Sequence, residues 1–404
     1  MAQEAHGAIY DLLAVRGVSR RDFMKYCGYV AAMLGLTEAA APQIAAAVEK
    51  GAKLKPALWL NGGSCSGCTE SIAQVDSPDV ATIVLELLSL NYFETIMAAA
   101  GEYAEKNVDD TIEAGNYLLI YEGAVMMGED GNTLLINGHK GKDILEKAAA
   151  GAQAILAVGA CAVDGGWVYA HPNPAGGIGV QSFLDSVKVA TPVVNLPCCP
   201  TSPEWVVAMV VQWLLVAEDD PATFLDKTAL LAKNYRDNYR DADVTLLYPE
   251  YIVGSTIHDN CPRRGHFENG EFVTEFGSPE EAMGYCLYKV GCKGPQTYTQ
   301  CPITRWNRSV SWCVQSGAPC IGCGGLNWVD NNAPFFKRLS SMRMGNTLGN
   351  VQPGSVGAVV GGVAAAALVA HGLGMKAAGR IGDGPPMEDM KVHDRKRMKK
   401  GGDK

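Results

Sequence analysis

The sequence has no excess of positive charge and carries few charged residues for its length. Its 404 residues include 34 Lys and Arg against 43 Asp and Glu, which gives a net charge of -9 at pH 7. A general nucleic-acid-binding surface is therefore not expected, because such surfaces are basic. The charged fraction of 19% and the hydrophobic fraction of 48% suit a globular protein with some membrane-directed sequence. The length allows two domains and a sizeable core, and there is no internal repeat.

The first 50 residues have the pattern of an export signal. Residues 19–25 read SRRDFMK, and the mildly apolar stretch 28–36 follows them. Paired arginines before a weakly apolar region are typical of the twin-arginine pathway, which carries folded proteins. We therefore predict a twin-arginine signal region over residues 1–50, with cleavage near Ala47 and export to the periplasmic, outer face of the cell membrane. The alternative is the start of an ordinary amphipathic helix.

The C-terminal region has the pattern of a membrane anchor. Residues 354–375 contain no Asp, Glu, Lys or Arg, and a spanning helix needs about 20 such residues. The strongly basic stretch 391–400, KVHDRKRMKK, follows, and basic flanks stay on the cytoplasmic side. We predict a C-terminal transmembrane helix with a basic tail. Because the stretch is rich in Gly and Ala, a soluble buried helix is the alternative.

Between residues 55 and 200, short apolar runs alternate with helix-compatible segments. The apolar runs cover residues 57–60, 81–88, 117–121, 154–158 and 192–196. The helix-compatible segments include residues 94–107 and 142–150. Continuous apolar runs that alternate with helices predict an α/β domain in which helices cover both faces of a parallel sheet. In such sheets ligands bind beyond the carboxyl ends of the strands.

Three of these runs are followed by cysteine. Cys65 and Cys68 follow the first run in GGSCSGCTES, Cys161 follows the fourth, and Cys198 and Cys199 follow the last. Loops far apart in the sequence would thus deliver thiols to one edge of the sheet. Cys65, Cys68, Cys161 and one of the last pair would make a four-thiolate site, which suits zinc or an iron–sulfur cluster. A second CxxC pair at zinc-ribbon spacing is lacking in this part of the chain.

The second half has little regular pattern, but it contains eight more residues of metal-ligand type. These are His258, Cys261, Cys286, Cys292, Cys301, Cys313, Cys320 and Cys323. The region 254–335 is rich in Gly, Pro, Asn and Trp, so its apolar core is expected to be weak. We predict a small, loop-rich domain that is organised around its cofactors.

The combination of motifs resembles the small, electron-transferring subunit of a membrane-bound [NiFe] hydrogenase. The resemblance rests on SRRDFMK, WLNGGSCSGCTES, NYFETIMAAAGE, GACA, NLPCCP, HDNCPRRGHF, CLYKVGCKGP, QCPITRWN and SGAPCIGCG. It implies a flavodoxin-like domain over residues 51–235, a cluster-binding domain over 236–345, and a linker, membrane anchor and basic tail over 346–404. It also implies a heterodimer, in which a separate large subunit holds the nickel–iron centre.

The same resemblance implies the ligands of three iron–sulfur clusters. The proximal [4Fe-4S] cluster would be held by Cys65, Cys68, Cys161 and Cys199. The distal [4Fe-4S] cluster would be held by His258, Cys261, Cys286 and Cys292. The medial cluster would be held by Cys301, Cys320 and Cys323.

Two positions distinguish this chain among such subunits. In members with a [3Fe-4S] medial cluster, proline usually follows the tryptophan that matches Trp312, whereas here Cys313 follows it. Cys313 is therefore the expected fourth medial ligand, and a [4Fe-4S] medial cluster is favoured over [3Fe-4S]. Oxygen-tolerant members have extra cysteines where this chain has Gly67 and Gly166, so an ordinary proximal cluster is expected. Cys198 takes the place of a small residue, as a buried thiol or as an alternative ligand during oxidation.

The implied function is the relay of electrons from hydrogen oxidation at the large subunit to a membrane acceptor. The resemblance suggests quinone as that acceptor, reached through a membrane cytochrome b. Two alternatives remain: a flavodoxin-like iron–sulfur subunit of a quinone reductase, and a zinc-stabilised scaffold module. The first would resemble only the half of the chain with the proximal site. The second would be colourless, whereas an iron–sulfur protein is brown.

Overall fold

The computed structural model describes residues 20–33, 37–45, 55–75, 88–216, 221–337, 342–343, 350–351 and 353–377. The chain divides into two compact units, Met1–Arg338 and Leu339–Lys404. The expected cleavage point near Ala47, most of the apolar run 81–88 and the basic tail 391–400 lie outside the described residues.

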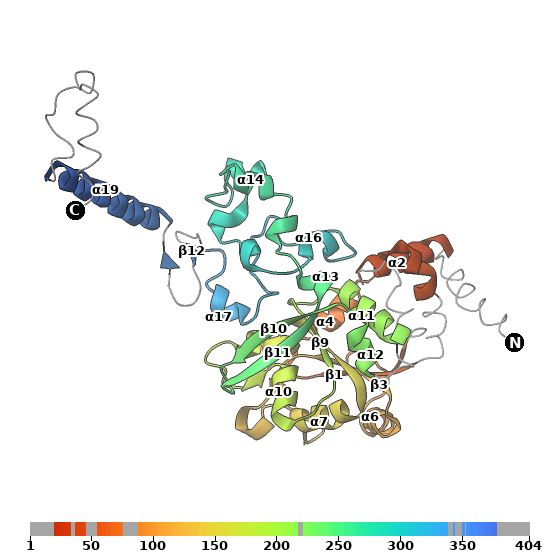
Figure 1. Ribbon diagram of the computed structural model, residues 1–404. Helices are drawn as coiled ribbons and strands as arrows, with labels where there is room; N and C mark the ends of the chain where they lie inside the picture. Colours follow the sequence, from red (N-terminus) through yellow and green to blue (C-terminus); the bar gives the residue numbers. More distant parts are fainter. Residues whose placement is uncertain are drawn as a thin grey trace, which may run out of the picture. The chain divides into compact units, whose positions relative to one another are not determined.

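A five-stranded parallel sheet forms the centre of the first unit (Figure 1). Its strands are β1 (Lys55–Asn61), β2 (Leu88–Phe93), β3 (Tyr117–Glu122), β7 (Ala152–Val158) and β9 (Val193–Leu196). They lie in the order β2-β1-β3-β7-β9, which in chain order is 2-1-3-4-5, the flavodoxin-like arrangement. The predicted α/β fold with a parallel sheet is confirmed. Strand β3 is buried at every position because helices cover both faces of the sheet.

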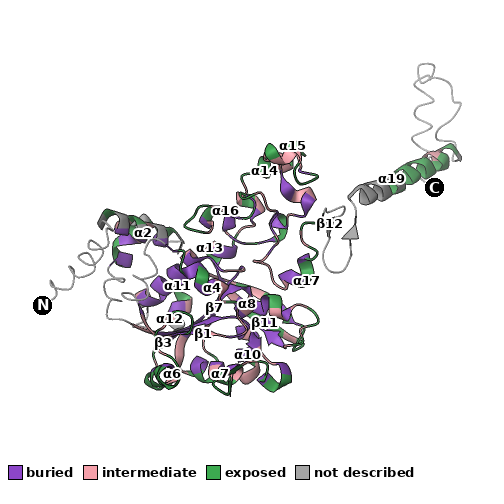
Figure 2. Cartoon of the chain, turned by 180° about the vertical axis from the view of Figure 1, so that it is seen from behind, coloured by how far each residue is buried: buried purple, intermediate pink, exposed green. Residues whose placement is uncertain are grey.

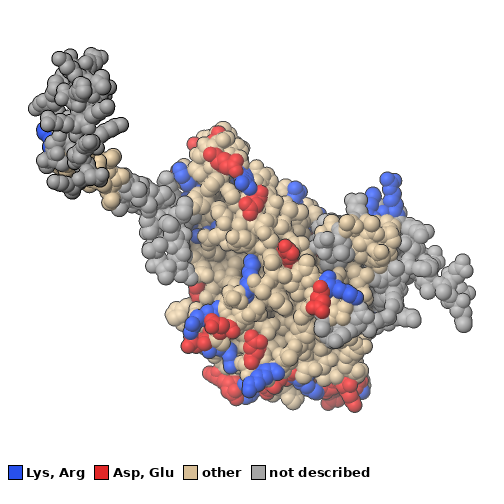
Figure 3. Space-filling view, viewed as in Figure 1, with Lys and Arg blue, Asp and Glu red and all other residues tan. Residues whose placement is uncertain are grey.

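Alternate residues of the strands belong to two separate apolar cores. Ala57 and Trp59 of β1 face one core, and Leu58 and Leu60 face the other. Helices α4 (Gly67–Ile72), α11 (Pro203–Val216) and α12 (Pro221–Asp226) cover the first face, and α6 (Glu102–Ala114), α7 (Gly141–Gly151) and α10 (Val180–Val187) cover the second. Figure 2 shows α11 buried over the sheet, and Figure 3 shows charged side chains of both signs gathered at the end of the molecule that carries α6 and α7. Because successive side chains of a strand point to opposite faces of the sheet, each strand contributes residues to both cores.

Two elements differ from their sequence predictions. The second strand begins at Leu88, so the run predicted at 81–88 overlaps it only at this residue among those described. The helix expected over 94–107 begins only at Glu102, because Gly101 has a φ of 59° and the preceding residues form turns. The other predicted strands and the helix expected over 142–150 lie where the pattern placed them.

The second part of this unit is built from a hairpin and very short helices. Antiparallel strands β10 (Leu230–Asp237) and β11 (Ala242–Pro249) form the hairpin, and β11 packs beside β9. The later elements are α13 (Glu250–Val253), η4 (His258–Asn260), α14 (Arg264–Glu268), α15 (Pro279–Ala282), η5 (Leu287–Val290), η6 (Gly294–Gln296), α16 (Cys301–Thr304) and α17 (Trp328–Asn332). No helix within 250–337, a range that the structure describes completely, exceeds five residues. This loop-rich stretch contains all eight ligand-type residues of the second half.

Smaller elements complete the described chain. They are α2 (Arg20–Met33), η1 (Glu38–Ala40), β4 (Val125–Met126), η3 (Gly128–Gly131), β5 (Leu135–Ile136), β6 (His139–Lys140), α8 (Gly159–Asp164), α9 (Gly166–Tyr169), β8 (Gly177–Ile178), β12 (Met342–Arg343) and β13 (Asn350–Val351). In the second unit, α19 (Pro353–Ala377) is a helix of 25 residues. Among the helices that the structure describes, none combines the length and the apolar character needed to cross a membrane.

Candidate metal centres

The carboxyl edge of the sheet gathers the thiols of the expected proximal site. Cys65 and Cys68 lie in the loop and helix after β1, Cys161 lies in α8 directly after β7, and Cys199 follows β9. Cys65 lies close enough to Cys161 and Cys199 to interact electrostatically with both, and Cys161 and Cys199 are likewise electrostatic neighbours of Cys68. The structure therefore brings these four side chains together, because parallel strands end at a common edge.

These thiols are held in surroundings that disfavour a bare negative charge. Burial, with neighbouring thiolates adding to it, raises the pKa of Cys161 to about 11 and the pKa of Cys199 to about 12. Burial, with the Glu122 carboxylate next in size, raises the pKa of Cys68 well above its usual range. Such groups become thiolates when a metal supplies the compensating positive charge. Cys65 alone of the four is exposed.

A buried glutamate holds the loop that carries the first two thiols. Glu122, 2% exposed at the end of β3, accepts hydrogen bonds from the backbone N–H groups of Cys68 and Thr69, both at 3.0 Å. It also accepts from Thr69 Oγ1 at 2.6 Å, Ser64 Oγ at 3.0 Å and Trp59 Nε1 at 3.2 Å. Sequence reasoning missed this residue. The available signal was a charged residue directly at the end of the apolar run 117–121.

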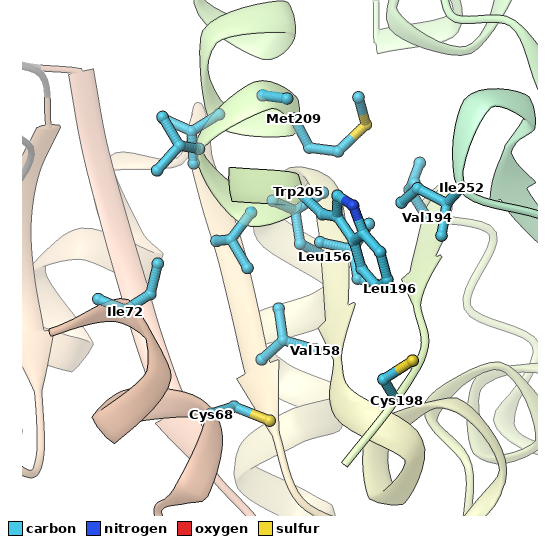
Figure 4. Close-up of a cluster of buried hydrophobic side chains, with 14 of the residues drawn as sticks. Cys68, Ile72, Leu156, Val158, Val194, Leu196, Cys198, Trp205, Met209 and Ile252 are labelled. Carbon is cyan, nitrogen blue, oxygen red and sulfur yellow. The ribbon is translucent and has the colours of Figure 1, made fainter. Parts of the chain in front are cut away.

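Adjacent residues Cys198 and Cys199 face different sites. Cys199 lies with Cys65 and Cys161, whereas the Cys198 side chain lies near those of Cys301 and Cys323. In the close-up of the core around Trp205, the sulfur of Cys198 is turned away from Cys68 (Figure 4). The geometry therefore favours Cys199 over Cys198 as the fourth thiol of the expected proximal site.

The expected medial ligands surround one cavity. Its volume is about 300 Å³, and its lining includes all of the medial candidates as well as Cys199. The cysteines of this lining are Cys199, Cys301, Cys313, Cys320 and Cys323. Cys313, although exposed, is close enough to Cys301 and Cys323 to interact electrostatically with both. The four thiols of the expected medial set, placed around one cavity, form a donor set that suits an iron–sulfur cluster.

The expected distal ligands line a second, much smaller cavity. His258, Cys261, Cys286 and Cys292 surround about 20 Å³, room for about one water. Their side chains must separate to admit a cluster, but their chemistry fits one. Burial, and then Arg264, lower the pKa of His258, which favours the neutral imidazole that metals bind. Burial raises the pKa of Cys286 to about 11.

In these loops the same local turn recurs, in which a backbone N–H group donates a hydrogen bond to a cysteine sulfur. The N–H group two residues after the cysteine donates to the sulfur of Cys261, Cys286, Cys292 and Cys320. Such donors stabilise a thiolate, because they place positive dipole ends at the sulfur. In the part of the chain that the structure describes, no three His, Cys, Asp or Glu side chains converge closely enough to hold a single metal ion.

Two further backbone hydrogen bonds connect neighbouring sites. The N–H group of Cys199, from the proximal set, donates to the sulfur of Cys323 in the medial set. The N–H group of Cys320, from the medial set, donates to the sulfur of Cys292 in the distal set. The three sets therefore follow one another without a gap, in the order proximal, medial, distal.

Two family models match the two parts of the first unit. Residues 253–336 match the model that describes the C-terminal region of NiFe/NiFeSe hydrogenase small subunits. Residues 65–213 match the model described as "NADH ubiquinone oxidoreductase, 20 Kd subunit". A quinone-reductase relationship is thus limited to the half with the proximal site, as expected from the sequence.

Relatives over most of the chain have one function in common. The periplasmic [NiFe] hydrogenase small subunit of Solidesulfovibrio fructosivorans is 39% identical over 328 residues, which cover 81% of this chain and 95% of the relative. The hydrogenase-1 small chain of Escherichia coli K12 is 37% identical over 366 residues, 90% of this chain and 91% of the relative. The solved [NiFeSe] hydrogenase of Desulfovibrio vulgaris Hildenborough superposes with a TM-score of 0.63 at 32% identity, covering 70% of this chain and 98% of that one. The motifs, the fold and these relatives together establish that the chain belongs to the [NiFe] hydrogenase small-subunit family.

Proposed function

We propose that this chain relays electrons from hydrogen oxidation at the nickel–iron site of a large subunit, through three iron–sulfur clusters, to a membrane acceptor. The observation that carries the proposal is the unbroken order of the three ligand sets, which backbone hydrogen bonds from Cys199 and Cys320 link. When bound, such clusters accept and release single electrons at potentials that ligand type, hydrogen bonds and burial adjust. The protein supplies the thiolates, the order of the sites and the exclusion of water.

The ligand sets follow from the groups that the fold brings together. We assign Cys65, Cys68, Cys161 and Cys199 to a proximal [4Fe-4S] cluster, and His258, Cys261, Cys286 and Cys292 to a distal [4Fe-4S] cluster. We assign Cys301, Cys313, Cys320 and Cys323 to a medial [4Fe-4S] cluster, because Cys313 lines the same cavity as the other three. Neutral His258 replaces an anionic thiolate, which should raise the potential of the distal site.

Metal analysis and spectroscopy of single-site variants test these assignments. In the purified complex, Cys68→Ala, Cys292→Ala and Cys301→Ala should each disturb one cluster and leave the other two, and each variant serves as a control for the others. Iron and sulfide content, together with electron paramagnetic resonance under reducing conditions, identify the cluster that is changed. A colourless wild-type protein that contains zinc would instead establish the scaffold alternative.

The large subunit should cover the proximal edge of the sheet. Cys65 is exposed there, and Trp167, whose side chain hydrogen-bonds to Cys199, is 51% exposed. A cluster bound beside an exposed thiol and an exposed indole would face solvent in the isolated chain. Burial by a partner removes that water and shortens the path to the partner's metal site.

The chain is further proposed to be exported by the twin-arginine pathway and anchored through α19. The proposal rests on Arg20 and Arg21, on the absence of charged residues from 354–375 and on the basic stretch 391–400. The domain limits 51–235, 236–345 and 346–404 are proposed with it. One relative is named as a quinone-reactive hydrogenase small chain, which supports quinone as the acceptor here. That a membrane cytochrome b passes the electrons to quinone is part of the proposal.

A further inference from the structure

The indole N–H group of Trp306 is buried without a hydrogen-bond partner. Trp306 lies in the loop between Cys301 and Cys313, and its ring packs against the larger apolar core. The Nε1 atom is shielded from solvent, and it has no hydrogen-bond partner among the residues that the structure describes. A buried donor that stays unpaired costs free energy, so such groups in folded proteins normally meet an acceptor. The acceptor of this N–H group must therefore come from outside the described chain.

The medial cavity is the space in which such an acceptor would lie. Trp306 is part of the lining of this cavity of about 300 Å³, together with the expected medial ligands. In the same lining, Thr297 Oγ1 already donates to a backbone carbonyl oxygen at 2.8 Å, and Ser311 Oγ and Ser316 Oγ are paired at 2.6 Å. Trp306 thus contributes an unused donor to a space whose bound cluster would be rich in sulfur acceptors. Indole N–H is a donor only, so the direction of the bond is unambiguous.

The surroundings of Trp306 fix the position of its ring. Trp306 and Ser311 form an antiparallel bridge, in which the Trp306 backbone N–H group donates to the Ser311 carbonyl oxygen at 2.8 Å. The residues on both sides are held at positive φ, 60° at Arg305 and 53° at Asn307, where L side chains crowd the backbone. The ring also makes an edge contact with Trp205, at a centroid distance of 5.9 Å and an interplanar angle of 77°. A strained loop that holds an aromatic donor at a cofactor cavity indicates a functional constraint.

We propose that the indole N–H group of Trp306 donates a hydrogen bond to a sulfur of the medial cluster and thereby raises the reduction potential of that cluster. Such a bond stabilises the reduced state more, because the additional electron increases the negative charge that the sulfurs carry. No proton moves with the electron, and the indole N–H bond stays intact in both redox states. The proposal rests on the medial assignment under the proposed function.

Two replacements at this position remove the N–H group in the purified heterodimer with the large subunit. Trp306→Phe keeps an aromatic ring, and benzothienylalanine incorporated at position 306 keeps the shape of indole, with sulfur in place of N–H. The medial midpoint potential is measured by an anaerobic redox titration followed by electron paramagnetic resonance. Trp205→Phe is the matched control, because Trp205 contacts the Trp306 ring but lies outside the cavity lining, and its N–H group donates to Thr304 Oγ1 at 3.2 Å.

Both replacements should lower the medial potential. We expect the equilibrium constant for reducing the medial cluster to fall about tenfold, which corresponds to about 59 mV for one electron. Trp205→Phe should leave this potential unchanged. Pulsed electron paramagnetic resonance of the reduced wild-type complex in deuterium oxide should also detect an exchangeable deuteron coupled to the medial cluster, and this coupling should be missing from both replacements.

Four results would overturn the proposal. One is an unchanged medial potential in both replacements. Another is a lowered potential with phenylalanine alone, because the benzothienyl ring also lacks the N–H group and the shift would then come from ring size. The third is an equal shift in Trp205→Phe, which would assign the effect to packing. The fourth is loss of the medial cluster with the benzothienyl ring in place, which would make Trp306 a residue that retains the cluster.

Failure of the proposed function is recognised separately. The wild-type complex would then lack a third cluster by iron content and by spectrum.

Discussion

At the scale of single residues, the expected cofactor sites depend on the side chains of individual residues, of which Cys313 and Glu122 are examples. Cys313 lines the same cavity as the three other expected medial ligands, Cys301, Cys320 and Cys323. Glu122 satisfies two backbone N–H groups of the CxxC helix while remaining buried. Cys313 provides a thiol and Glu122 provides a hydrogen-bond acceptor to a loop that binds a cluster. We therefore expect substitution of either residue to disturb cluster binding more readily than the overall fold.

We predict that Cys313 decides the iron content of the medial cluster. In oxidised, anaerobically prepared complex the wild type should give no three-iron resonance signal, because four thiolates retain the fourth iron. Cys313→Pro should produce that sharp signal at about one spin per complex, whereas Cys313→Ser, which keeps an oxygen ligand, should produce less of it. A stoichiometric three-iron signal in the undamaged wild type would refute the four-iron assignment.

Glu122 should stabilise both the loop and the cluster that the loop binds. Glu122→Ala leaves the N–H groups of Cys68 and Thr69 without an acceptor, which should cost about 3 kcal/mol of unfolding free energy. We expect a lower melting temperature and a partial loss of proximal iron. Glu94→Ala, at an exposed position after β2, is the control and should leave both quantities unchanged. Equal behaviour of the two variants would show that the Glu122 hydrogen bonds are dispensable.

At the scale of elements, buried polar contacts join the sheet domain to the loop-rich part. Asp164, the last residue of α8, accepts hydrogen bonds from the N–H groups of Gly166 at 3.0 Å and Asn327 at 2.6 Å. Asn327 directly precedes α17, so one carboxyl group connects α8 and α17. Asp164 is 2% exposed, and burial, opposed in part by these two hydrogen bonds, raises its pKa to about 6.

This raised pKa predicts a pH dependence of stability. The folded protein binds the Asp164 proton more tightly than the unfolded chain does, so the resulting stabilisation is complete below about pH 4. It is lost as the pH rises through about 6, by an amount on the order of 3 kcal/mol. The stability difference between wild type and Asp164→Asn, measured by urea unfolding, should therefore shrink from pH 4 to pH 7. A difference that stays constant over this range would contradict the prediction, and Asp330→Asn, at an exposed aspartate, is the control.

At the scale of the whole molecule, we expect the location of the chain to depend on segments at its two ends. The described part of the N-terminal region includes α2, which begins at Arg20, and the C-terminal unit contains α19. Both segments bear on where the electron relay operates, and each can be tested without touching a cluster ligand.

Removal of the chain from Gly354 onward should release the complex from the membrane. The uncharged stretch 354–375 and the basic tail are then absent, and the ligand sets remain complete. Fractionation should find hydrogenase activity in the soluble periplasmic fraction, with an artificial electron acceptor as substrate. A truncated complex that still sediments with membranes, in cells without a membrane partner subunit, would rule out α19 as the anchor.

Replacement of Arg20 and Arg21 by lysine should prevent export. The twin-arginine pathway requires the arginine pair, so folded complex with its clusters should accumulate in the cytoplasm. Immunoblots of cell fractions measure the distribution. Lys25→Arg, which preserves charge outside the pair, is the control. Normal periplasmic levels of the double-lysine variant would refute twin-arginine export.

The sequence by itself determined the kind of chemistry and most of the architecture. Apolar runs at 117–121 and 154–158 are long enough and sufficiently free of polar residues to specify buried parallel strands. Cysteines directly after strands must meet at one edge, because parallel strands end together. Ligand type and position therefore pointed to metal cofactors in both parts of the chain, and the family resemblance implied that they are three clusters.

Tertiary structure alone decided which neighbouring residue faces which site. Cys198 and Cys199 are identical in type, and their surroundings in the folded chain differ: Cys199 lies with Cys65 and Cys161, and Cys198 lies near Cys301 and Cys323. Glu122 became recognisable only when residues of β1, the CxxC loop and β3 met around its carboxylate. Local sequence patterns indicate secondary-structure propensity and burial. The different surroundings of Cys198 and Cys199 and the role of Glu122 arise instead from backbone direction and from contacts between distant segments. Cys68 and Glu122, for example, are more than 50 residues apart in the sequence.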